Sequence, residues 1–288
     1  PAPSRDLFDN YSYKKYYSKK FGYKTTAIMT SRGCPFNCDF CSRPVFGNEF
    51  RSRSASKVVD EIKEVISLGY NRIWFADDCF TLNRKWLIEV CDEIIERGLK
   101  ISWECLSRVD TLDFETAAKM KKAGCIRMFF GIESGNDSIL KIMNKQITTK
   151  QAYIATQLCK KKGIKAGAFF ILGYPGENAK TILETVKFAS SLPLDYLSFT
   201  LPYPIPGTPL FERLRGELVS EEWEEPKNIQ MIKHKLLFYS QVTELKLKFA
   251  VVKGMIQFYT RKYLGEQGYE FVGKPFEVVT DAVYDKMS

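Results

Sequence analysis

The feature that most constrains the fold is a rhythm that recurs along the chain, in which an amphipathic helix ends at a glycine and a short apolar strand follows. In "SKVVDEIKEVISLGYNRIWFADD", Val58, Ile62 and Val65 recur at helical spacing, and Gly69 separates them from a strand at 72–76. Six such strands are expected, at residues 25–30, 72–76, 101–106, 126–132, 166–172 and 195–201. Because strands that alternate with helices pair in parallel through right-handed crossovers, the sequence predicts an α/β fold around a parallel sheet.

The number of strand–helix units selects between the parallel architectures. Six units are too few for a closed eight-stranded barrel, so residues 25–215 are predicted to form a partial barrel. A doubly wound sheet is the alternative, since periodicity alone does not separate the two. We interpret residues 1–24, rich in Tyr and Lys, as a linker or docking arm that is disordered or lies across the barrel. Residues 216–288 are interpreted as a mainly helical C-terminal extension, with 220–264 helical.

Composition narrows the setting in which the chain works. The 288 residues contain no run of eighteen apolar residues, so no membrane span is predicted. Eight cysteines without a disulfide pattern favour a reducing, cytoplasmic location. The net charge is +9, but the lysine runs before Gly124 and Gly163 are typical of helix C-termini, which argues against nucleic acid as the partner. Because the first residue is Pro1 and not Met, we expect that the chain was processed or belongs to a longer protein.

Polar residues gather where the predicted strands end. In parallel βα folds the reactive groups lie at the C-terminal ends of the strands, so these residues are expected to share one site. They are Asp77, Asp78 and Cys79 after the second strand, Glu104, Cys105, Arg108 and Asp110 on and after the third, Gly131, Glu133 and Ser134 at the fourth, and "GYPGE" (173–177) after the fifth. A single Asp at such a position is equally well explained as a helix cap. Charged groups at three successive strand ends favour a site for a cationic or hydroxyl-rich ligand.

The loop after the first strand carries three cysteines in "SRGCPFNCDFC", which are Cys34, Cys38 and Cys41. A structural zinc site takes four protein ligands, and the only histidine, His234, lies nearly two hundred residues away. Asp39 is flanked by two of the proposed ligands and is badly placed to join them. Three thiolates instead suit a four-iron cluster in which one iron is left for another ligand. The alternative is three core cysteines, but the glycine and proline in this stretch indicate a tight loop.

The order Cys-x3-Cys-x2-Cys on the first βα loop, with Phe40 directly before the third cysteine, resembles the radical S-adenosylmethionine (radical SAM) enzymes over about residues 25–215. The resemblance implies a partial (β/α)6 radical SAM barrel, in agreement with the six strands above, followed here by the helical extension. It also implies that Cys34, Cys38 and Cys41 hold a [4Fe–4S] cluster whose free iron takes the amino and carboxylate groups of S-adenosylmethionine (SAM). Reductive cleavage of SAM would give a 5′-deoxyadenosyl radical that abstracts hydrogen from a substrate.

The same resemblance implies cofactor-binding residues at the other strand ends. They are Phe40 beside the adenine, Asp78 at the SAM amino group, Arg108 at the SAM carboxylate, Glu133 and the adjacent Ser134 at the ribose or methionyl end, and Gly173 flanking the adenine. Asp78 departs from the family pattern, because this chain has "ADD" where the family often has Gly-Gly-Glu. No catalytic residue is assigned beyond the three cluster ligands.

A narrower resemblance concerns the cobalamin-dependent radical SAM class, which includes methyltransferases acting on unactivated carbon and ring cyclases of porphyrin metabolism. It rests on "WFADDCFTLNR", "WECLSRVDTLD", "GIESGNDSILKIMNK" and "PYPIPGTPL". Members usually carry an N-terminal cobalamin-binding domain, which 24 residues cannot hold, and "PAPSRDLFDNY" is similar to the linker that follows it. We therefore expect that this chain alone does not hold cobalamin. The domain was removed in cis or is supplied in trans, or the protein has dropped cobalamin and kept only hydrogen abstraction.

The resulting expectation is an enzyme that abstracts hydrogen from an unknown organic substrate, for C-methylation or ring formation with cobalamin in the full system. An electron donor such as a flavodoxin or ferredoxin is the expected partner. An RNA-modifying enzyme of the methylthiotransferase type is the first alternative, but the sequence has no second cysteine triplet and no small β-barrel RNA module after residue 216. A non-enzymatic iron–sulfur electron carrier is the last alternative, and it would leave the polar strand ends without a purpose.

Overall fold

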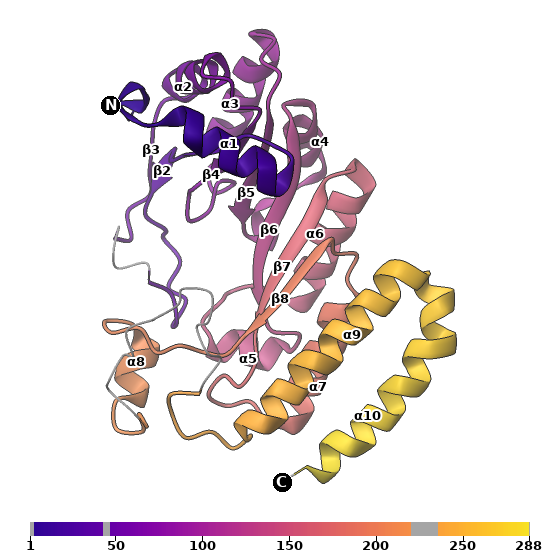
Figure 1. The fold of residues 1–288 in the computed structure, drawn as a ribbon. Coiled ribbons are helices and arrows are strands. Elements are labelled where there is room, and N and C mark those ends of the chain that lie inside the picture. The colour runs from indigo at the N-terminus through magenta and orange to yellow at the C-terminus, as the bar shows by residue number, and fades with distance from the viewer. Residues whose placement is uncertain (1–2, 43–46, 220–235, 288) are drawn as a thin grey trace. The chain divides into compact units, whose positions relative to one another are not determined.

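The computed structural model describes residues 3–42, 47–219 and 236–287 (Figure 1). The chain divides into two compact units. Unit 1 consists of Pro1–Pro35, Asn48–Phe130 and Ala155–Ala166. Unit 2 consists of Phe36–Gly47, Gly131–Ile154 and Gly167–Ser288.

Six strands form one sheet in the order β1-β4-β5-β6-β7-β8. Their bounds are β1 Thr25–Ile28, β4 Arg72–Phe75, β5 Ser102–Ser107, β6 Cys125–Glu133, β7 Lys165–Ile171 and β8 Tyr196–Thr200. The strand pairs β1–β4, β4–β5, β5–β6 and β7–β8 are all parallel. A doubly wound sheet would reverse its strand order near the middle, whereas these strands follow one another in chain order. The predicted six-stranded parallel α/β fold is therefore confirmed, and the doubly wound alternative is wrong.

The helices of unit 1 form where the apolar rhythm predicts them. They are α2 Ala55–Ser67, α3 Arg84–Glu96 and α4 Phe114–Lys122, and a short 3-10 turn, η3 Val109–Thr111, precedes α4. The α3 N-terminus is capped by Asn83, whose side chain accepts from the Trp86 N–H, and α4 is capped in the same way by Asp113. After α4 the chain turns at Gly124, where φ is +99° and an added Cβ would lie 2.1 Å from the Ile101 carbonyl oxygen. Only glycine fits at that turn into β6.

The N-terminal segment that the sequence indicated as a linker is helical in the described residues. A 3-10 turn, η1 Arg5–Leu7, leads into α1 Asn10–Phe21. Side-chain bonds tie the segment to the rest of unit 1, and they include an ion pair between Arg5 and Glu61 at 2.6 Å. The Arg5 Nη2 donates to the Ala27 carbonyl at 2.8 Å, the Tyr70 hydroxyl donates to Asn10 Oδ1 at 2.7 Å, and Lys14 Nζ donates to the Leu68 carbonyl at 2.5 Å. The described part of this segment is therefore ordered within unit 1, and its role as a docking arm stays a prediction.

Unit 2 contains the remaining helices. They are α5 Asp137–Ile142, part of α6 Thr149–Lys162, α7 Ala179–Ser191, α8 Pro209–Leu214, α9 Glu244–Gly268, the π-helical turn η4 Tyr269–Gly273, and α10 Lys274–Lys286. Helix α9 packs along α7, and α10 returns beside α9 (Figure 1). None of the helices in the described residues combines the length and the apolar character that a membrane crossing requires.

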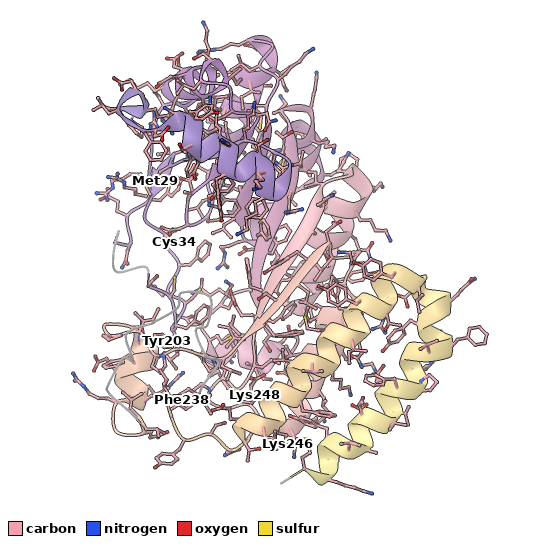
Figure 2. All side chains as sticks on the ribbon, in the orientation of Figure 1. Met29, Cys34, Tyr203, Phe238, Lys246 and Lys248 are labelled. Atoms are coloured by element: carbon pink, nitrogen blue, oxygen red, sulfur yellow. The ribbon has the colours of Figure 1, made fainter. Side chains whose placement is uncertain are left out.

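The start of the helical extension differs from the prediction. The predicted helix over 220–264 begins at Glu244 within the described residues, where Thr243 caps it, and its positions 220–235, with His234, lie outside the described residues. Before the cap, Phe238 bridges to Leu218 in antiparallel fashion and is buried in an apolar cluster with Tyr174 and Leu210 (Figure 2). Burial of Phe238 against this cluster therefore overrides the helical pattern around it.

Candidate functional site

The base of the cysteine loop is fixed inside unit 1 by a short ladder and by one buried carboxylate. The two-residue strands β2 Ser31–Arg32 and β3 Arg51–Ser52 pair antiparallel and bring together the two ends of the loop. Asp77 Oδ1 accepts from the Thr30 and Ser31 N–H groups at 2.8 and 2.5 Å, and its Oδ2 accepts from the Thr30 hydroxyl at 2.7 Å. Burial raises the pKa of Asp77, although the three hydrogen bonds oppose that shift. Asp77 therefore positions the chain that enters the loop.

The eight thiols fall into two groups by burial. None of them is in a disulfide. Five are buried in the fold, at positions Cys79, Cys91, Cys105, Cys125 and Cys159, whereas the three loop cysteines are partly exposed. Burial raises the pKa of Cys79 and Cys105, and it raises that of Cys91 to about 12, so these thiols stay protonated. Only the loop thiols thus have the accessibility that metal ligands require.

The boundary between the two units passes through the triplet. Cys34, which Figure 2 labels, belongs to unit 1, while Cys38 and Cys41 belong to unit 2. The Cys41 N–H donates to the Cys38 carbonyl at 3.3 Å, which closes a turn between the second and third cysteines. Within the described residues, no three His, Cys, Asp or Glu side chains are already placed to hold a metal ion. The donor set fits an iron–sulfur cluster by its chemistry, with three accessible thiols on one loop.

Inside unit 2, the part of the loop around Asp39 is held by backbone and ionic contacts. The Asp39 N–H donates to the Met143 carbonyl, and the Leu210 N–H donates to the Asp39 carbonyl, each at 3.1 Å. The Asp39 carboxylate pairs with Arg213 of α8 at 3.2 Å. The Asn144 side chain also donates to the Asn37 carbonyl at 2.7 Å. Asp39 thus anchors this part of the loop through its backbone and its carboxylate.

Phe40 lies in an aromatic and cationic environment. Its ring meets that of Tyr174 edge-on, with centroids 6.2 Å apart and planes at 81°. The ammonium of Lys145 lies 5.8 Å from the Phe40 ring centroid, and the Arg213 guanidinium lies 5.7 Å from the centroid of Tyr174. Phe40 is half-buried, so part of its surface is available to another planar group. Stacking on such a ring is a common way to hold a nucleobase.

Lys145 connects Phe40 to Glu133, another predicted site residue. Lys145 Nζ donates to Glu133 Oε1 at 3.0 Å, and both side chains are nearly buried. Glu133 has a φ of +72°, which is uncommon for a residue with a Cβ and is found where a site demands a particular backbone direction. A Cβ at Gly131 would lie 2.3 Å from Glu133 Oε1, so glycine is required there for the carboxylate to turn back over the strand end. Phe40, Lys145 and Glu133 thus form one constellation in unit 2.

The two predicted cofactor-binding residues in unit 1, Asp78 and Arg108, differ in exposure. Asp78 is exposed after β4, whereas its neighbour Asp77 is buried. Arg108 is buried and makes a two-pronged bond to Asp110, with Nε–Oδ1 and Nη2–Oδ2 distances of 2.9 Å. Glu104, inside β5, pairs with Arg127 on the neighbouring strand β6 at 3.4 Å. Glu104 and Asp110 therefore have structural partners, while Asp78 faces solvent.

The two other predicted residues of unit 2 lie in backbone turns. Ser134 is fully buried; its hydroxyl is 3.1 Å from the Thr185 hydroxyl on α7 and accepts from the Asn136 N–H at 3.2 Å. Gly173 has a φ of +86°, and an added Cβ would lie 2.7 Å from a Leu247 methyl group on α9. The Gly173 N–H donates to Glu177 Oε2 at 2.7 Å. Ser134 is thus used within the fold, and Gly173 is required by its turn.

Sequence reasoning did not single out several residues that shape this site. They are Lys145, Tyr174, Glu177 and Arg213 in unit 2. Glu177 and Tyr174 lie within the quoted "GYPGE" motif, so a closer reading of that motif would have found them. Lys145 is the last residue of the quoted "GIESGNDSILKIMNK", and its contact with Glu133 spans 12 residues of sequence. Arg213 contacts Asp39 across 174 residues, and no quoted motif marks it.

Comparison with known proteins identifies the class. The model of the Radical SAM superfamily matches residues 28–189, more than half of the chain. The chain therefore belongs to the radical SAM superfamily, whose members use a [4Fe–4S] cluster and SAM, and the predicted resemblance is confirmed. The sites named above have not been tested by these comparisons and stay predictions.

Two curated relatives are similar to this chain in sequence over most of its length. An uncharacterized methyltransferase of Pyrococcus horikoshii is 38% identical over 265 residues, which cover 91% of this chain and 56% of that protein. An anaerobic magnesium-protoporphyrin IX monomethyl ester cyclase of Cereibacter sphaeroides is 34% identical over 72% of this chain and 35% of its own length. The chain thus spans about half, or less, of the relatives that it matches.

Solved structures show the same fold. The methyltransferase TsrM of Kitasatospora setae, with cobalamin and a [4Fe–4S] cluster bound, superposes with a TM-score of 0.64 at 23% identity, over 69% of this chain and 40% of that one. The cobalamin-dependent enzyme OxsB superposes with a TM-score of 0.63 at 18% identity, over 90% of this chain and 46% of that one. At these identities the likeness establishes the fold and leaves the reaction to other evidence.

Proposed function

We propose that this chain is the catalytic part of a radical SAM enzyme that cleaves SAM reductively and abstracts hydrogen from an organic substrate. The observation that carries the proposal is the sorting of the thiols, in which Cys34, Cys38 and Cys41 are accessible on one loop and the other five are buried. These three cysteines would hold a [4Fe–4S] cluster. When bound, the cluster supplies the electron for cleavage of the SAM sulfonium.

The constellation of unit 2 supports a role in holding the cosubstrate. The half-buried face of Phe40 suits the adenine, and Tyr174 and Lys145 hold that ring in place. Glu133 keeps acceptor capacity beyond its bond to Lys145, because a carboxylate accepts several hydrogen bonds. We assign it to the ribose hydroxyls or the methionyl ammonium, with Gly173 flanking the adenine.

The other proposed SAM-binding residues differ in the hydrogen bonds that they would have to give up to bind SAM. Asp78 is exposed and can meet the SAM amino group without giving up a buried partner. Arg108 can meet the SAM carboxylate only if it shares or releases its two bonds to Asp110. Ser134 would have to give up its bonds to Thr185 and Asn136. Asp78 and Glu133 are therefore the two residues that carry the cosubstrate assignment.

The reaction outcome we propose is C-methylation or ring formation, with cobalamin supplied by a domain in cis or in trans and electrons supplied by a flavodoxin or ferredoxin. The names of the two curated relatives, a methyltransferase and a cyclase, support this pair of outcomes. The substrate class is an organic molecule with a carbon–hydrogen bond that the radical can reach.

The test is anaerobic reconstitution of the chain with iron and sulfide, followed by SAM and a reductant, with 5′-deoxyadenosine as the measured product. The proposal expects its formation to depend on both the reductant and the iron. Iron–sulfur loading without any cleavage of SAM would favour the alternative of an electron carrier and would reject the proposal.

RNA modification of the methylthiotransferase type remains the alternative reaction. The five cysteines outside the loop are buried and dispersed over unit 1, so the described residues offer no second accessible triplet for an auxiliary cluster. Dependence of turnover on added transfer RNA would favour this alternative over C-methylation or cyclisation.

A further inference from the structure

The turn after β7 is organised by one buried carboxyl group. Glu177 closes the "GYPGE" stretch, and its Oε2 accepts from the N–H groups of Gly173 and Tyr174 at 2.7 and 2.9 Å. Gly173 is the residue assigned above to the adenine, and Tyr174 is the residue that meets Phe40 edge-on. The position of Glu177 therefore sets the geometry of both groups.

Half of this carboxyl group has no hydrogen-bond partner in the described residues. Glu177 is 3% exposed, and its Oε1 is buried without a donor. Tyr284 on α10 is fully buried, and its hydroxyl is likewise without a partner. A buried polar atom left without a partner costs about 1–3 kcal/mol, so each calls for an explanation. Gln257 Nε2 and Arg261 Nε of unit 2 also lack a hydrogen bond in the described residues.

The face that α10 turns inward makes Tyr284 unusual. The buried residues of α10 are polar or part-polar, namely Glu277, Thr280 and Tyr284, whereas Val278, Val279 and Val283 point outward and are exposed. An ordinary amphipathic helix would show the reverse. The inward face of α10 thus carries polar groups into the interior of unit 2.

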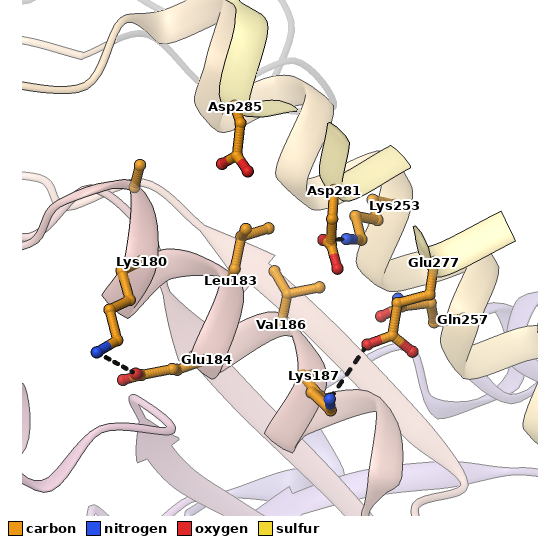
Figure 3. Close-up of a pocket in the computed structure, with 11 residues that line it drawn as sticks. Lys180, Leu183, Glu184, Val186, Lys187, Lys253, Gln257, Glu277, Asp281 and Asp285 are labelled. Carbon is orange, nitrogen blue, oxygen red and sulfur yellow. Dashed lines mark hydrogen bonds and ion pairs between the residues drawn. The ribbon is translucent and has the colours of Figure 1, made fainter. Parts of the chain in front are cut away.

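These polar contacts are visible along the helix. Glu277 accepts from the Tyr269 hydroxyl at 2.5 Å and pairs with Lys187 of α7 at 3.5 Å, and Asp281 pairs with Lys253 of α9. A pocket of about 460 Å³ lies beside these pairs, and residues of α7, α9 and α10 line it (Figure 3). Helix α10 is therefore held on unit 2 through hydrogen bonds and ion pairs, and Tyr284 continues this series one turn after Asp281.

We propose that Glu177 is a positioning residue for the cosubstrate turn, and that Tyr284 of α10 is the donor that completes its carboxylate. The proposal rests on the assignment of Gly173 and Phe40 to SAM under the proposed function. In this arrangement the ionised Glu177 holds the two N–H groups of the turn with one oxygen and receives the Tyr284 hydroxyl with the other. The C-terminal helix thereby controls how firmly the adenine side of the site is held.

The charges around the pair agree with this arrangement. Burial raises the pKa of Glu177 to about 7, and the two backbone N–H groups oppose that shift. Burial, and then the charges of Glu177 and Asp285, raise the pKa of Tyr284, which therefore remains a donor at every working pH. The Lys246 ammonium lies 5.0 Å from the Tyr284 ring centroid (Figure 2 labels Lys246). A donor from Tyr284 favours the ionised form of Glu177 and lowers its pKa.

The experiment measures SAM affinity of the reconstituted chain between pH 6 and pH 8.5 in the wild type and in two conservative variants. We expect the affinity of the wild type to rise with pH as Glu177 ionises. Glu177→Gln should lose the part of that rise due to Glu177, and Tyr284→Phe should move it to higher pH. Tyr263→Phe, on an exposed tyrosine of α9, is the matched control and should leave the profile unchanged.

A second measurement separates this inference from the proposed function. The carboxyl carbon of Glu177 is followed by carbon-13 NMR in the chain without SAM, and its signal is assigned by its loss in Glu177→Gln. An upward shift of the Glu177 midpoint in Tyr284→Phe supports the pairing even if the wild type binds no SAM, which would count against the proposed function alone. An unchanged midpoint, or SAM profiles that coincide in all variants, overturns the inference.

Discussion

At the scale of single residues, neighbours of identical type have opposite roles. Asp77 and Asp78 both follow β4, and the sequence offered a structural and a functional role for either. The alternation along the strand distinguishes them, because Asp77 continues the buried parity of Ile73 and Phe75, whereas Asp78 faces outward. Extending the period of two beyond the strand end would have predicted which aspartate is structural.

Other residue-scale features could not be predicted. The bond between Lys145 and Glu133 joins side chains 12 residues apart, and the position of the Glu133 carboxylate depends on the space that Gly131 leaves. The two-pronged bond from Arg108 to Asp110 depends on rotamers that a sequence does not reveal. Positions of polar groups at strand ends were therefore predictable, whereas their pairings were not.

The first prediction concerns the cluster ligands. Cys38→Ala should abolish the iron–sulfur absorbance after reconstitution, because two thiolates do not hold a four-iron cluster. Cys159→Ala, which removes a buried thiol of α6, is the control and should retain it. Iron and sulfide analysis with visible absorbance checks both variants. A full complement of four irons in Cys38→Ala would refute the assignment of the triplet.

The second prediction concerns the cosubstrate. Asp78→Ala and Glu133→Ala should each weaken SAM binding while they keep the iron content. Loss of a charge-assisted hydrogen bond costs about 1.5–3 kcal/mol, or roughly ten- to a hundred-fold in affinity. Calorimetric titration measures this effect, and Glu89→Ala, on the exposed side of α3, is the control. Wild-type affinity in both site variants would remove these residues from the binding site.

At the scale of elements, the long periodic segments were predicted well and the short ones were missed. Strands such as β7 carry continuous apolar runs that only a strand buried on both faces explains. The pair β2–β3 has two residues on each strand, and two residues have no period to detect. The segment 236–243 carries a helical pattern, but it is irregular because Phe238 is drawn into the apolar cluster.

The third prediction concerns the base of the cysteine loop. Asp77→Ala leaves the Thr30 N–H, the Ser31 N–H and the Thr30 hydroxyl without their buried acceptor. We expect a loss of roughly 2–4 kcal/mol in the free energy of unfolding, together with poorer retention of iron. Urea unfolding and iron analysis measure the two effects. Asp77→Asn keeps an acceptor oxygen and should lose less, so equal losses in the two variants would contradict this role.

At the scale of the whole molecule, the stability of the chain should depend on the ionisation of Glu177. Its ordinary pKa is 4.5 and burial raises it to about 7, so the folded chain binds this proton more tightly than the unfolded chain. The contribution of Glu177 is therefore fully present below pH 4.5 and is lost as the pH rises through 7. The loss amounts to roughly 3 kcal/mol, at about 1.4 kcal/mol for each pKa unit.

The fourth prediction follows from this sign. Between pH 5 and pH 8, the free energy of unfolding should fall less in Glu177→Gln than in the wild type, because the amide does not ionise. Urea denaturation at several pH values measures the difference between the two proteins, in which the other titrating groups cancel. Parallel pH profiles would show that Glu177 has the same pKa in the folded and unfolded chains.

The fifth prediction concerns cobalamin. We expect the 288-residue chain to cleave SAM and to bind cobalamin weakly or not at all, since the chain spans about half of its relatives and the described residues are accounted for by the barrel and the helical extension. Absorbance titration with hydroxocobalamin measures this binding. Tight binding of one cobalamin per chain would place the site within these two parts and would reject the expectation of a separate domain.

The division of the cysteines into three accessible and five buried thiols also determines how the protein responds to oxygen. A buried, protonated thiol reacts slowly with oxidants and alkylating reagents, whereas thiols on an accessible loop react first. Three accessible cysteines within eight residues can join one another or a neighbouring chain in disulfides before iron arrives, while the buried five remain intact. Oxygen would therefore inactivate the chain without unfolding it: the damaged protein would keep its fold and would have lost the ability to load its metal.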